Sequence, residues 1–223
     1  ISGLSSALLL ERLGCNVIVF EKDKYIKSEG AGIQITSNGL FVLKKLDLDR
    51  PVVEAGLKPN KLCLIDESDF KSIGCLEIRH RLKRRYGRSF ITLHRSLLVK
   101  ILFEKVREKK IRVNFGSRAL PLVKKDHENI YISYKGKKIE KDLIVVADGV
   151  GSSWKSTIFR ENKTRNITQS AYRFVLSNKN LPPIFSENNI NLFFGKGRHF
   201  VTYPTGKNGL INFVFCKRES GHT

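Results

Sequence analysis

The stretch ISGLSSALLLERLGCNVIVFE, residues 1–21, has the pattern of a helix, a glycine turn and a buried strand that ends in an acid. Leu4 and Leu8 recur at helical spacing, and Gly14 stands where a helix would stop in a left-handed turn. The apolar run at residues 17–20 is typical of a strand buried on both faces of a parallel sheet. The segment indicates the later part of a βαβ unit, and we expect its opening strand and first glycines to be missing from this chain.

Two residues of this stretch are candidates for binding a dinucleotide. Glu21 ends the strand, and in dinucleotide-binding units an acid about 20 residues after the glycine fingerprint accepts hydrogen bonds from a ribose. Gly3 takes the place of the last fingerprint glycine, where we expect helix and strand to pack too closely for a Cβ. An ordinary buried βα unit with a terminal acid is the alternative, and this segment alone leaves it open.

The composition is that of a globular protein. The chain has 223 residues, 41% hydrophobic residues and six prolines, and no apolar run is long enough to span a bilayer. Its four cysteines lack the spacing of a metal site or of a disulfide framework, and we expect Cys15 and Cys216 to be small core residues. A reducing, cytoplasmic location is therefore predicted.

The net charge of +20 raises nucleic acid or an anionic membrane surface as possible partners. Basic residues crowd at residues 79–88, 105–110 and 135–141, and the first of these stretches is predicted to be a loop. No zinc-finger ligands and no aromatic strand of the RNA-recognition type accompany the charge. A solvated basic surface is therefore favoured over a specific nucleic-acid site.

The pattern along the chain changes from α/β to β. After a polar loop, a glycine-rich segment at residues 30–38 leads into a helix, and a turn or helix end follows near residues 53–58. An amphipathic helix is predicted at residues 96–109 and a short one at 152–159. A boundary is expected near residues 161–168. Strands are predicted at residues 62–66, 74–78, 111–115, 119–125, 130–134, 137–140, 143–147, 172–177, 190–194, 199–202 and 210–215.

Separated motifs occur in one order along the chain: Gly3 to Glu21, Leu93-His94-Arg95 before a helix, and Asp148-Gly149 after an apolar run. Together they resemble the class A flavoprotein monooxygenases, in particular the branch of salicylate hydroxylase and 6-hydroxynicotinate monooxygenase. The segments at residues 30–38, 172–173 and 195–204 are similar to the flavin loop and the substrate-sheet signatures of that branch. The resemblance covers essentially the whole chain.

The resemblance implies an α/β fold, with a Rossmann-like FAD-binding domain of the para-hydroxybenzoate hydroxylase type and an interleaved β-sheet substrate domain. It assigns residues 1–61 and 88–163 to the FAD-binding part, and residues 62–87 and 164–223 to the substrate part. Because motifs expected beyond the substrate sheet are also missing, the sequence is interpreted as an incomplete fragment, and its activity by itself is in doubt.

The resemblance also implies site residues. FAD is the expected cofactor, with Glu21 on its ribose and Arg95 reaching the cofactor; the residues expected to bind it are Gly3, Glu21, Lys22, Gly32, Arg95 and Asp148. The alternative for Arg95 is a surface arginine at a helix start, and for Asp148 an ordinary turn. No metal site is predicted.

Arg173, His199 and Tyr203 match active-site positions of related members, with a surface arginine, a rim histidine and a core tyrosine as the alternatives. His199 and Tyr203 are four apart, so on a strand both would face the same side. The implied reaction uses NADH or NADPH and dioxygen to hydroxylate a small aromatic substrate, and Arg173 would bind its carboxylate. A reductase or epoxidase, a basic nucleic-acid or membrane binding module, and a non-catalytic flavoprotein remnant are the other hypotheses.

Overall fold

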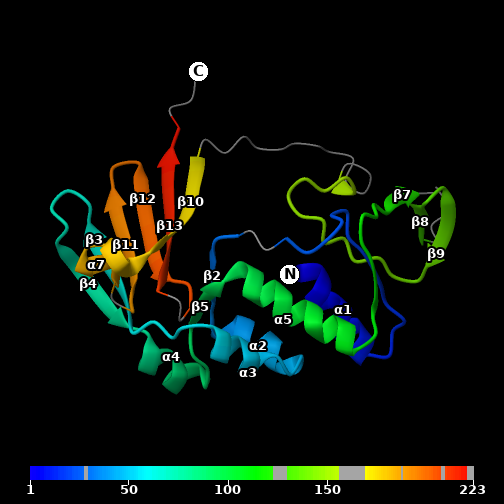
Figure 1. Ribbon diagram of the computed structural model, residues 1–223, viewed down its shortest axis with the longest axis horizontal. Helices are drawn as coiled ribbons and strands as arrows, with labels where there is room; N and C mark the ends of the chain where they lie inside the picture. Colours follow the sequence, from blue (N-terminus) through cyan, green and yellow to red (C-terminus); the bar gives the residue numbers. More distant parts are fainter. Residues whose placement is uncertain (28–29, 123–129, 156–168, 187, 207–208, 220–223) are drawn as a thin grey trace. The chain divides into compact units, whose positions relative to one another are not determined.

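The computed structural model describes residues 1–27, 30–122, 130–155, 169–186, 188–206 and 209–219 (Figure 1). The chain divides into two compact units. We call them the first unit, Ile1–Ile26 with Leu102–Arg165, and the second unit, Lys27–Ile101 with Asn166–Thr223.

The first unit is built on two parallel strands, and the register pairs Val19 with Val113. The helix before the first strand buries Ala7 and Leu8, and Gly14 leaves it with φ +85°, as the sequence pattern predicts. An antiparallel meander follows the second strand. The elements are α1 (Ser2–Arg12), β1 (Ile18–Phe20), β6 (Arg112–Asn114), β7 (Leu120–Leu122), β8 (Ile130–Tyr134) and β9 (Lys137–Lys141).

Helix α5 (Arg95–Glu108) begins in the second unit and continues into the first. Its apolar stripe is the one that the sequence predicts, because Leu98, Leu102 and Val106 lie one turn apart and are almost fully buried. A short turn at residues 109–110, with Lys110 at φ +56°, leads from α5 into β6.

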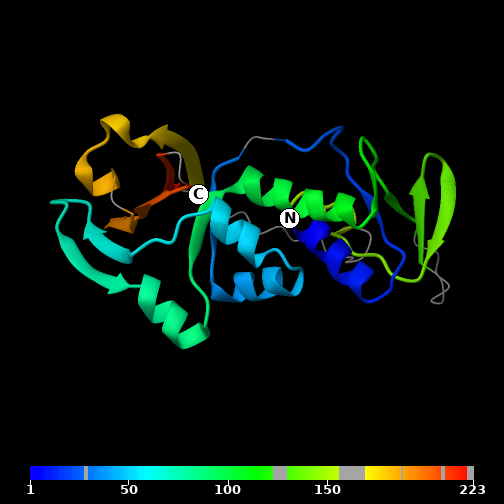
Figure 2. The same cartoon turned by 60° about the horizontal axis from the view of Figure 1, so that its bottom comes forward.

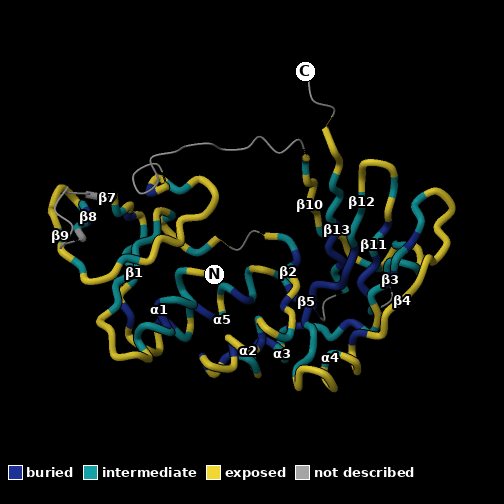
Figure 3. The backbone as a smooth tube through the Cα atoms, turned by 180° about the vertical axis from the view of Figure 1, so that it is seen from behind, coloured by how far each residue is buried: buried dark blue, intermediate teal, exposed yellow. Residues whose placement is uncertain are grey.

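The second unit contains a two-stranded ribbon and a six-stranded sheet, whose central strands are mostly buried (Figure 3). The ribbon consists of β2 (Gly32–Ile35) and β5 (Ile91–His94), paired antiparallel. The sheet has the order β10 (Gln169–Ser177), β13 (Leu210–Arg218), β12 (Arg198–Pro204), β11 (Ile190–Gly195), β3 (Lys61–Asp66) and β4 (Ser72–Glu77). Its helices are α2 (Ser37–Lys45), α3 (Asp49–Ala55), α4 (Arg79–Tyr86), α7 (Pro183–Ser186) and the 3-10 turn η1 (Asn178–Asn180).

One face of the six-stranded sheet is an aromatic layer. The Phe200 and Phe213 rings stack with centroids 5.5 Å apart, and Phe174 stacks on Phe213 at 5.0 Å. Phe185 of α7 packs against this layer, with its ring 5.7 Å from that of Phe193. Phe185 covers part of this face, whereas Phe174 at the β10 edge is 43% exposed. The alternate residues of the same strands line the opposite face.

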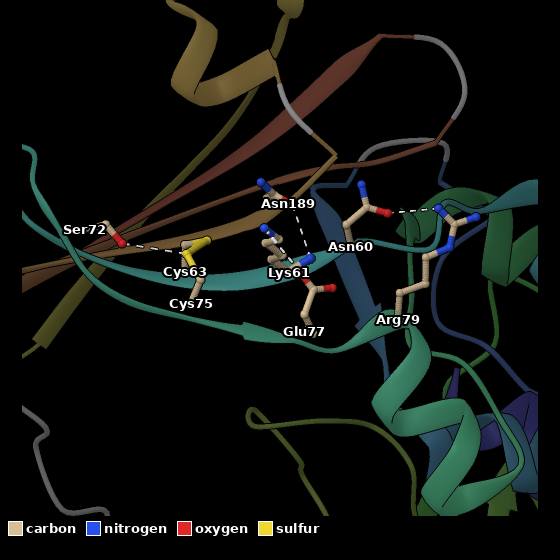
Figure 4. A network of polar contacts seen from close by, with 8 residues as sticks. All are labelled: Asn60, Lys61, Cys63, Ser72, Cys75, Glu77, Arg79 and Asn189. Atoms are coloured by element: carbon tan, nitrogen blue, oxygen red, sulfur yellow. Dashed lines mark hydrogen bonds and ion pairs between the residues drawn. A yellow bond between two sulfur atoms is a disulfide. The ribbon is translucent and has the colours of Figure 1, made fainter.

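The hairpin of β3 and β4 leads into α4 (Figure 4). Cys63 and Cys75 are opposite each other in the register and form a disulfide, with Cα atoms 4.1 Å apart. Asn60 anchors the start of α4, because its carbonyl accepts from the backbone N–H of Ile78 and its side chain accepts from Arg79 Nη1 at 2.9 Å. The expectation that the cysteines form no disulfide is therefore wrong.

Several local predictions also differ from the structure. The basic stretch predicted as a loop is the helix α4, because Arg, Lys and Leu favour helices and Gly87, at φ +67°, ends it in a left-handed cap. The turn or helix end predicted near residues 53–58 is confirmed, since α3 ends at Ala55. Cys15 is exposed rather than buried, and Cys216 is half-buried.

Residues 143–147, predicted as a fully buried strand, lie in irregular structure. Leu143 and Val145 expose 60% and 48% of their surfaces. An apolar run becomes a strand only where a neighbouring strand takes up its backbone hydrogen bonds, and none of the described strands pairs with it. The expected domain boundary near residues 161–168 and the second half of the helix predicted at 152–159 lie outside the described residues.

Candidate active site

In the first unit, Glu21 stands at the carboxyl end of β1, the end at which ligands bind in parallel sheets. Its backbone N–H donates to the Asn114 carbonyl at 2.9 Å, and its own carbonyl accepts from Ser117 N–H at 2.8 Å. Glu21 Oε1 accepts one hydrogen bond, from Asp23 N–H at 3.0 Å. The half-buried carboxylate is thus held in place and keeps acceptor positions for a diol. Lys22 beside it is exposed.

Helix α1 offers an anion-binding end in the same unit. Its first turn, which begins at Ser2, contains no acidic residue, and the backbone N–H groups of a first helical turn favour anions. Gly3 lies in that turn, and a Cβ built on it would be 3.5 Å from Ala147 Cβ. That distance is an ordinary contact, and the expected close packing of Gly3 against the opening strand stays a prediction. The contact nevertheless brings Gly3 beside the residue that precedes Asp148.

Asp148 is exposed and begins a turn. Its Oδ2 accepts from Ser153 N–H at 3.2 Å, and Gly149 follows with φ +83°. The carboxylate therefore stabilises the turn, as the alternative interpretation expects, and its exposed position leaves it accessible to a ligand.

In the second unit, Gly32 is packed where no other residue would fit. A Cβ on Gly32 would lie 2.6 Å from Tyr203 Cε2, 2.7 Å from Thr205 Cγ2 and 2.8 Å from Asn212 Cβ. Its N–H donates to Asn212 Oδ1 at 2.6 Å, and this bond is buried. The glycine-rich segment that the sequence singles out therefore lies directly on strands β12 and β13.

Arg95 lies beside the same loop. Its backbone N–H donates to the Ala31 carbonyl at 3.1 Å, and a Cβ on Gly30 would be 3.4 Å from Arg95 Cβ. Arg95 itself is exposed, while His94 Nδ1 is 2.6 Å from Ser96 Oγ. Strand β5 and the start of α5 thus hold a cation next to Gly30, where it is accessible to an anionic ligand.

Arg173, His199 and Tyr203 lie on one face of the six-stranded sheet. The register places Val214 opposite both Arg173 and Val201, and side chains of opposite residues point to the same face. Because β-strand side chains alternate, the residues two before and two after Val201, His199 and Tyr203, share that face. It is the face opposite to the aromatic layer, and Gly32 packs on it at Tyr203.

Tyr203 is 5% exposed, and burial raises its pKa to about 12, with Arg173 acting in the opposite direction. Burial disfavours the phenolate more than the Arg173 cation favours it. At physiological pH the Tyr203 hydroxyl is therefore protonated and can donate a hydrogen bond.

Two buried polar residues of this region were missed from the sequence. Asn212 and Thr92 are both fully buried, and Asn212 Nδ2 and Thr92 Oγ1 lack a hydrogen-bond partner among the described residues. The sequence did contain a signal for Asn212, because it lies inside the apolar strand LINFVF, and a polar side chain in a buried strand requires a hydrogen-bond partner. Thr92 gave no such signal, since threonine is common in strands.

Each unit carries groups that fit a part of an FAD molecule. In the first unit, Glu21 can accept hydrogen bonds from a ribose, and the backbone N–H groups at the start of α1 can bind a phosphate. In the second unit, the exposed Arg95 cation beside Gly30 can bind a phosphate. Among the described residues no cluster of three or more His, Cys, Asp or Glu could hold a metal ion.

Comparison with known families agrees with this chemistry. Residues 1–220 match the family described as FAD binding domain. The chain belongs to this family. The named relatives within it are hydroxylases and monooxygenases, in keeping with the class A flavin monooxygenases that the sequence resembles.

The curated relatives are aromatic-ring enzymes. The chain is 27% identical over 225 residues to 3-hydroxybenzoate 6-hydroxylase 1 of Aquipseudomonas alcaligenes, covering 98% of the chain and 56% of the relative. It is 24% identical over 214 residues to 3-amino-4-hydroxybenzoate 2-monooxygenase of Streptomyces cremeus, covering 96% of the chain and 53% of the relative. The chain thus spans about half the length of the curated relatives it matches.

Solved structures confirm the α/β fold of this flavoprotein. Klebsiella pneumoniae HpxO, complexed with FAD and uric acid, superposes with a TM-score of 0.82 at 20% identity, covering 99% of this chain and 55% of that one. CtdE in complex with FAD and substrate 4 gives a TM-score of 0.83 at 22% identity, with 100% and 56% covered.

Proposed function

We propose that the protein containing this chain is an FAD-dependent monooxygenase that hydroxylates a small aromatic substrate. The substrate class is a carboxylated phenol or a hydroxylated N-heteroaromatic acid, in keeping with the hydroxybenzoate names of the relatives. The reaction consumes the aromatic compound, NADH or NADPH, a proton and dioxygen, and yields the hydroxylated product, the oxidised nucleotide and water. FAD, when bound, supplies the activation of dioxygen.

The packing of Gly32 on Tyr203 is the observation that carries the proposal. It joins the flavin loop of this family to the sheet face that bears Arg173 and His199. An aromatic ring held on that face would lie close to the loop, and the chemistry requires substrate and flavin to be close.

Each side chain of the face has a distinct proposed role. Arg173 pairs with the substrate carboxylate, and the protonated Tyr203 hydroxyl donates a hydrogen bond to a substrate oxygen. His199 accepts the phenolic proton, because an ionised phenol is the better nucleophile. For the cofactor, Glu21 accepts from a ribose, and Arg95 and the α1 N-terminus bind phosphate oxygens; Gly3, Lys22, Gly32 and Asp148 complete the proposed set.

Substitution at Arg173 tests the substrate role. Arg173→Gln should raise KM for a carboxylated aromatic by about ten- to a hundredfold, the effect of losing a charged hydrogen-bond pair. Arg173→Lys should restore part of the lost affinity for the carboxylated substrate. Arg218→Gln is the control, because it changes an exposed arginine of the same sheet and should leave KM at the wild-type value. An unchanged KM for Arg173→Gln would exclude the carboxylate-binding role.

The cytoplasm, where NADH and NADPH are regenerated, is the proposed location. The Cys63–Cys75 disulfide removes one ground for this proposal, because disulfides are uncommon in reducing compartments. Separately, among the described residues no helix has the length and apolar character needed to cross a bilayer. Quantifying free thiols in protein alkylated inside the cell would test the location: a fully reduced pair supports the cytoplasm.

A further inference from the structure

A dense group of cations lies on the surface of α4. The helix has eight residues, none of them acidic, and its only apolar aliphatic side chain, Leu82, packs inward against the cluster of Ile78, Ile190 and Tyr203. The remaining positions are exposed (Figure 3). They carry Arg79, His80, Arg81, Lys83, Arg84 and Arg85, followed by Tyr86.

An open hollow of about 680 Å³ lies on this helix, lined by His80, Arg81, Lys83, Arg84 and Glu77. The Glu77 carboxylate is already paired with Lys61 Nζ at 3.3 Å. The side chains around this open hollow therefore carry a net positive charge.

Exposed apolar side chains adjoin the cations. Phe41 and Val42 of α2 are 47% and 40% exposed, and Tyr86 at the end of α4 is 50% exposed. The Arg88 guanidinium lies 5.0 Å from the Phe41 ring, and the Arg88 carbonyl accepts from Ser37 Oγ at 3.0 Å. These contacts join α2 to the loop after α4, and the two helices are neighbours in Figures 1 and 2.

Cations and exposed apolar side chains occur together on one surface, which we call the α2–α4 face. It consists of Phe41, Val42, Lys44, Lys45, Arg81, Lys83, Arg84, Arg85, Tyr86 and Arg88. We propose that the α2–α4 face binds the surface of an anionic phospholipid bilayer. Its cations would contact headgroup phosphates, and its aromatic side chains would enter the boundary between headgroups and acyl chains. On nucleic acid the same cations would bind phosphates, but Phe41 and Val42 would gain no apolar surroundings, so the membrane is the better partner.

Vesicle flotation of the full polypeptide tests the proposal. Vesicles of phosphatidylcholine with phosphatidylserine should bind the protein, and vesicles of phosphatidylcholine alone should not. Arg81→Gln, Lys83→Gln and Arg84→Gln in one variant should weaken binding at least about tenfold, because each basic residue near such a surface contributes roughly a fivefold factor. Glutamine keeps the helix propensity of α4, and thermal unfolding verifies that the variant is folded.

A matched control removes the same charge elsewhere. Lys135→Gln, Lys137→Gln and Lys138→Gln, all exposed in the β8–β9 hairpin, should leave vesicle binding within about twofold of the wild type. Phe41→Ala with Tyr86→Ala should also weaken binding while preserving its dependence on salt.

Three results would overturn the proposal. The first is equal binding to both kinds of vesicle. The second is an equal loss of vesicle binding in the α4 variant and in the hairpin control. The third is that the protein binds duplex DNA and not vesicles, and that the α4 variant no longer binds the DNA. The last result would assign the face to nucleic acid instead. The proposal does not depend on the proposed enzymatic activity, because its measurements use neither flavin nor aromatic substrate.

Discussion

At the scale of single residues, the contact between Gly32 and Tyr203 connects two motifs that lie far apart in the sequence. Local patterns singled out both residues, but only the folded chain brings them together with Asn212. The sequence could not predict the partner of Gly32, because the pairing of a loop with a strand 180 residues away leaves no local signal. Gly3 is a different case, since its one close neighbour is Ala147 and the packing that its motif predicts involves the opening strand.

Gly32→Ala is expected to destabilise the second unit. Its methyl group would overlap three side chains, and overpacking of this kind costs about 1–3 kcal/mol. Thermal or denaturant unfolding should report the loss. Gly74→Ala is the control, because Gly74 has no atom within 4 Å of the added Cβ. Equal stability of the two variants would contradict the described packing.

The buried Tyr203 predicts a stability change in alkaline solution. Its pKa is raised from 10.0 in the unfolded chain to about 12 in the folded one. The neutral phenol therefore makes its full contribution to the free energy of unfolding below about pH 10. This contribution, up to about 2 kcal/mol, is lost as the pH rises from about 10 to 12. Unfolding measured across this range should show the decline, and Tyr203→Phe should remove that part of it. The same alkaline slope in both proteins would argue against a buried phenol.

At the scale of elements, the amphipathic helix α5, the helix α1 and most strands of the second unit follow from periodicity alone. The basic helix α4 was not predicted, because its crowded charge was interpreted as a solvated loop. Arginine and lysine are nevertheless good helix formers. Leu82 marks the core face of the helix, and the cap at Gly87 marks its end. The strand predicted at residues 143–147 is absent for a different reason. Hydrophobicity predicts burial, but a strand also needs a neighbour, and pairing is a property of the whole sheet.

The β3–β4 hairpin should depend on its disulfide. Closing a loop of 12 residues stabilises a protein by about 2–3 kcal/mol in the chain-entropy description. Reducing agent should therefore lower the unfolding midpoint of the wild type, while the double variant Cys63→Ala, Cys75→Ala should be less stable and insensitive to reductant. If the oxidised protein yields four free thiols on alkylation, the cross-link is absent and this expectation is wrong.

At the scale of the whole molecule, composition predicted a globular α/β protein, and the motif order predicted its family, which the match over residues 1–220 confirms. The strand order of the six-stranded sheet was beyond local reasoning. Strand β11 pairs in parallel with β3, more than a hundred residues earlier, so the sheet interleaves distant segments. The net charge of +20 carried no fold information, yet its concentration on α4 becomes meaningful once the helix is placed beside exposed aromatic side chains.

The central claim is that the protein inserts one atom of dioxygen into an aromatic acid. The most direct measurement supplies the full polypeptide with FAD, NADH or NADPH, labelled dioxygen and a panel of hydroxybenzoates and hydroxylated N-heteroaromatic acids, and analyses the products by mass spectrometry. We predict a hydroxylated product that carries one labelled oxygen, formed only with reduced nucleotide. Consumption of reduced nucleotide without a labelled aromatic product from any member of the panel would contradict the account.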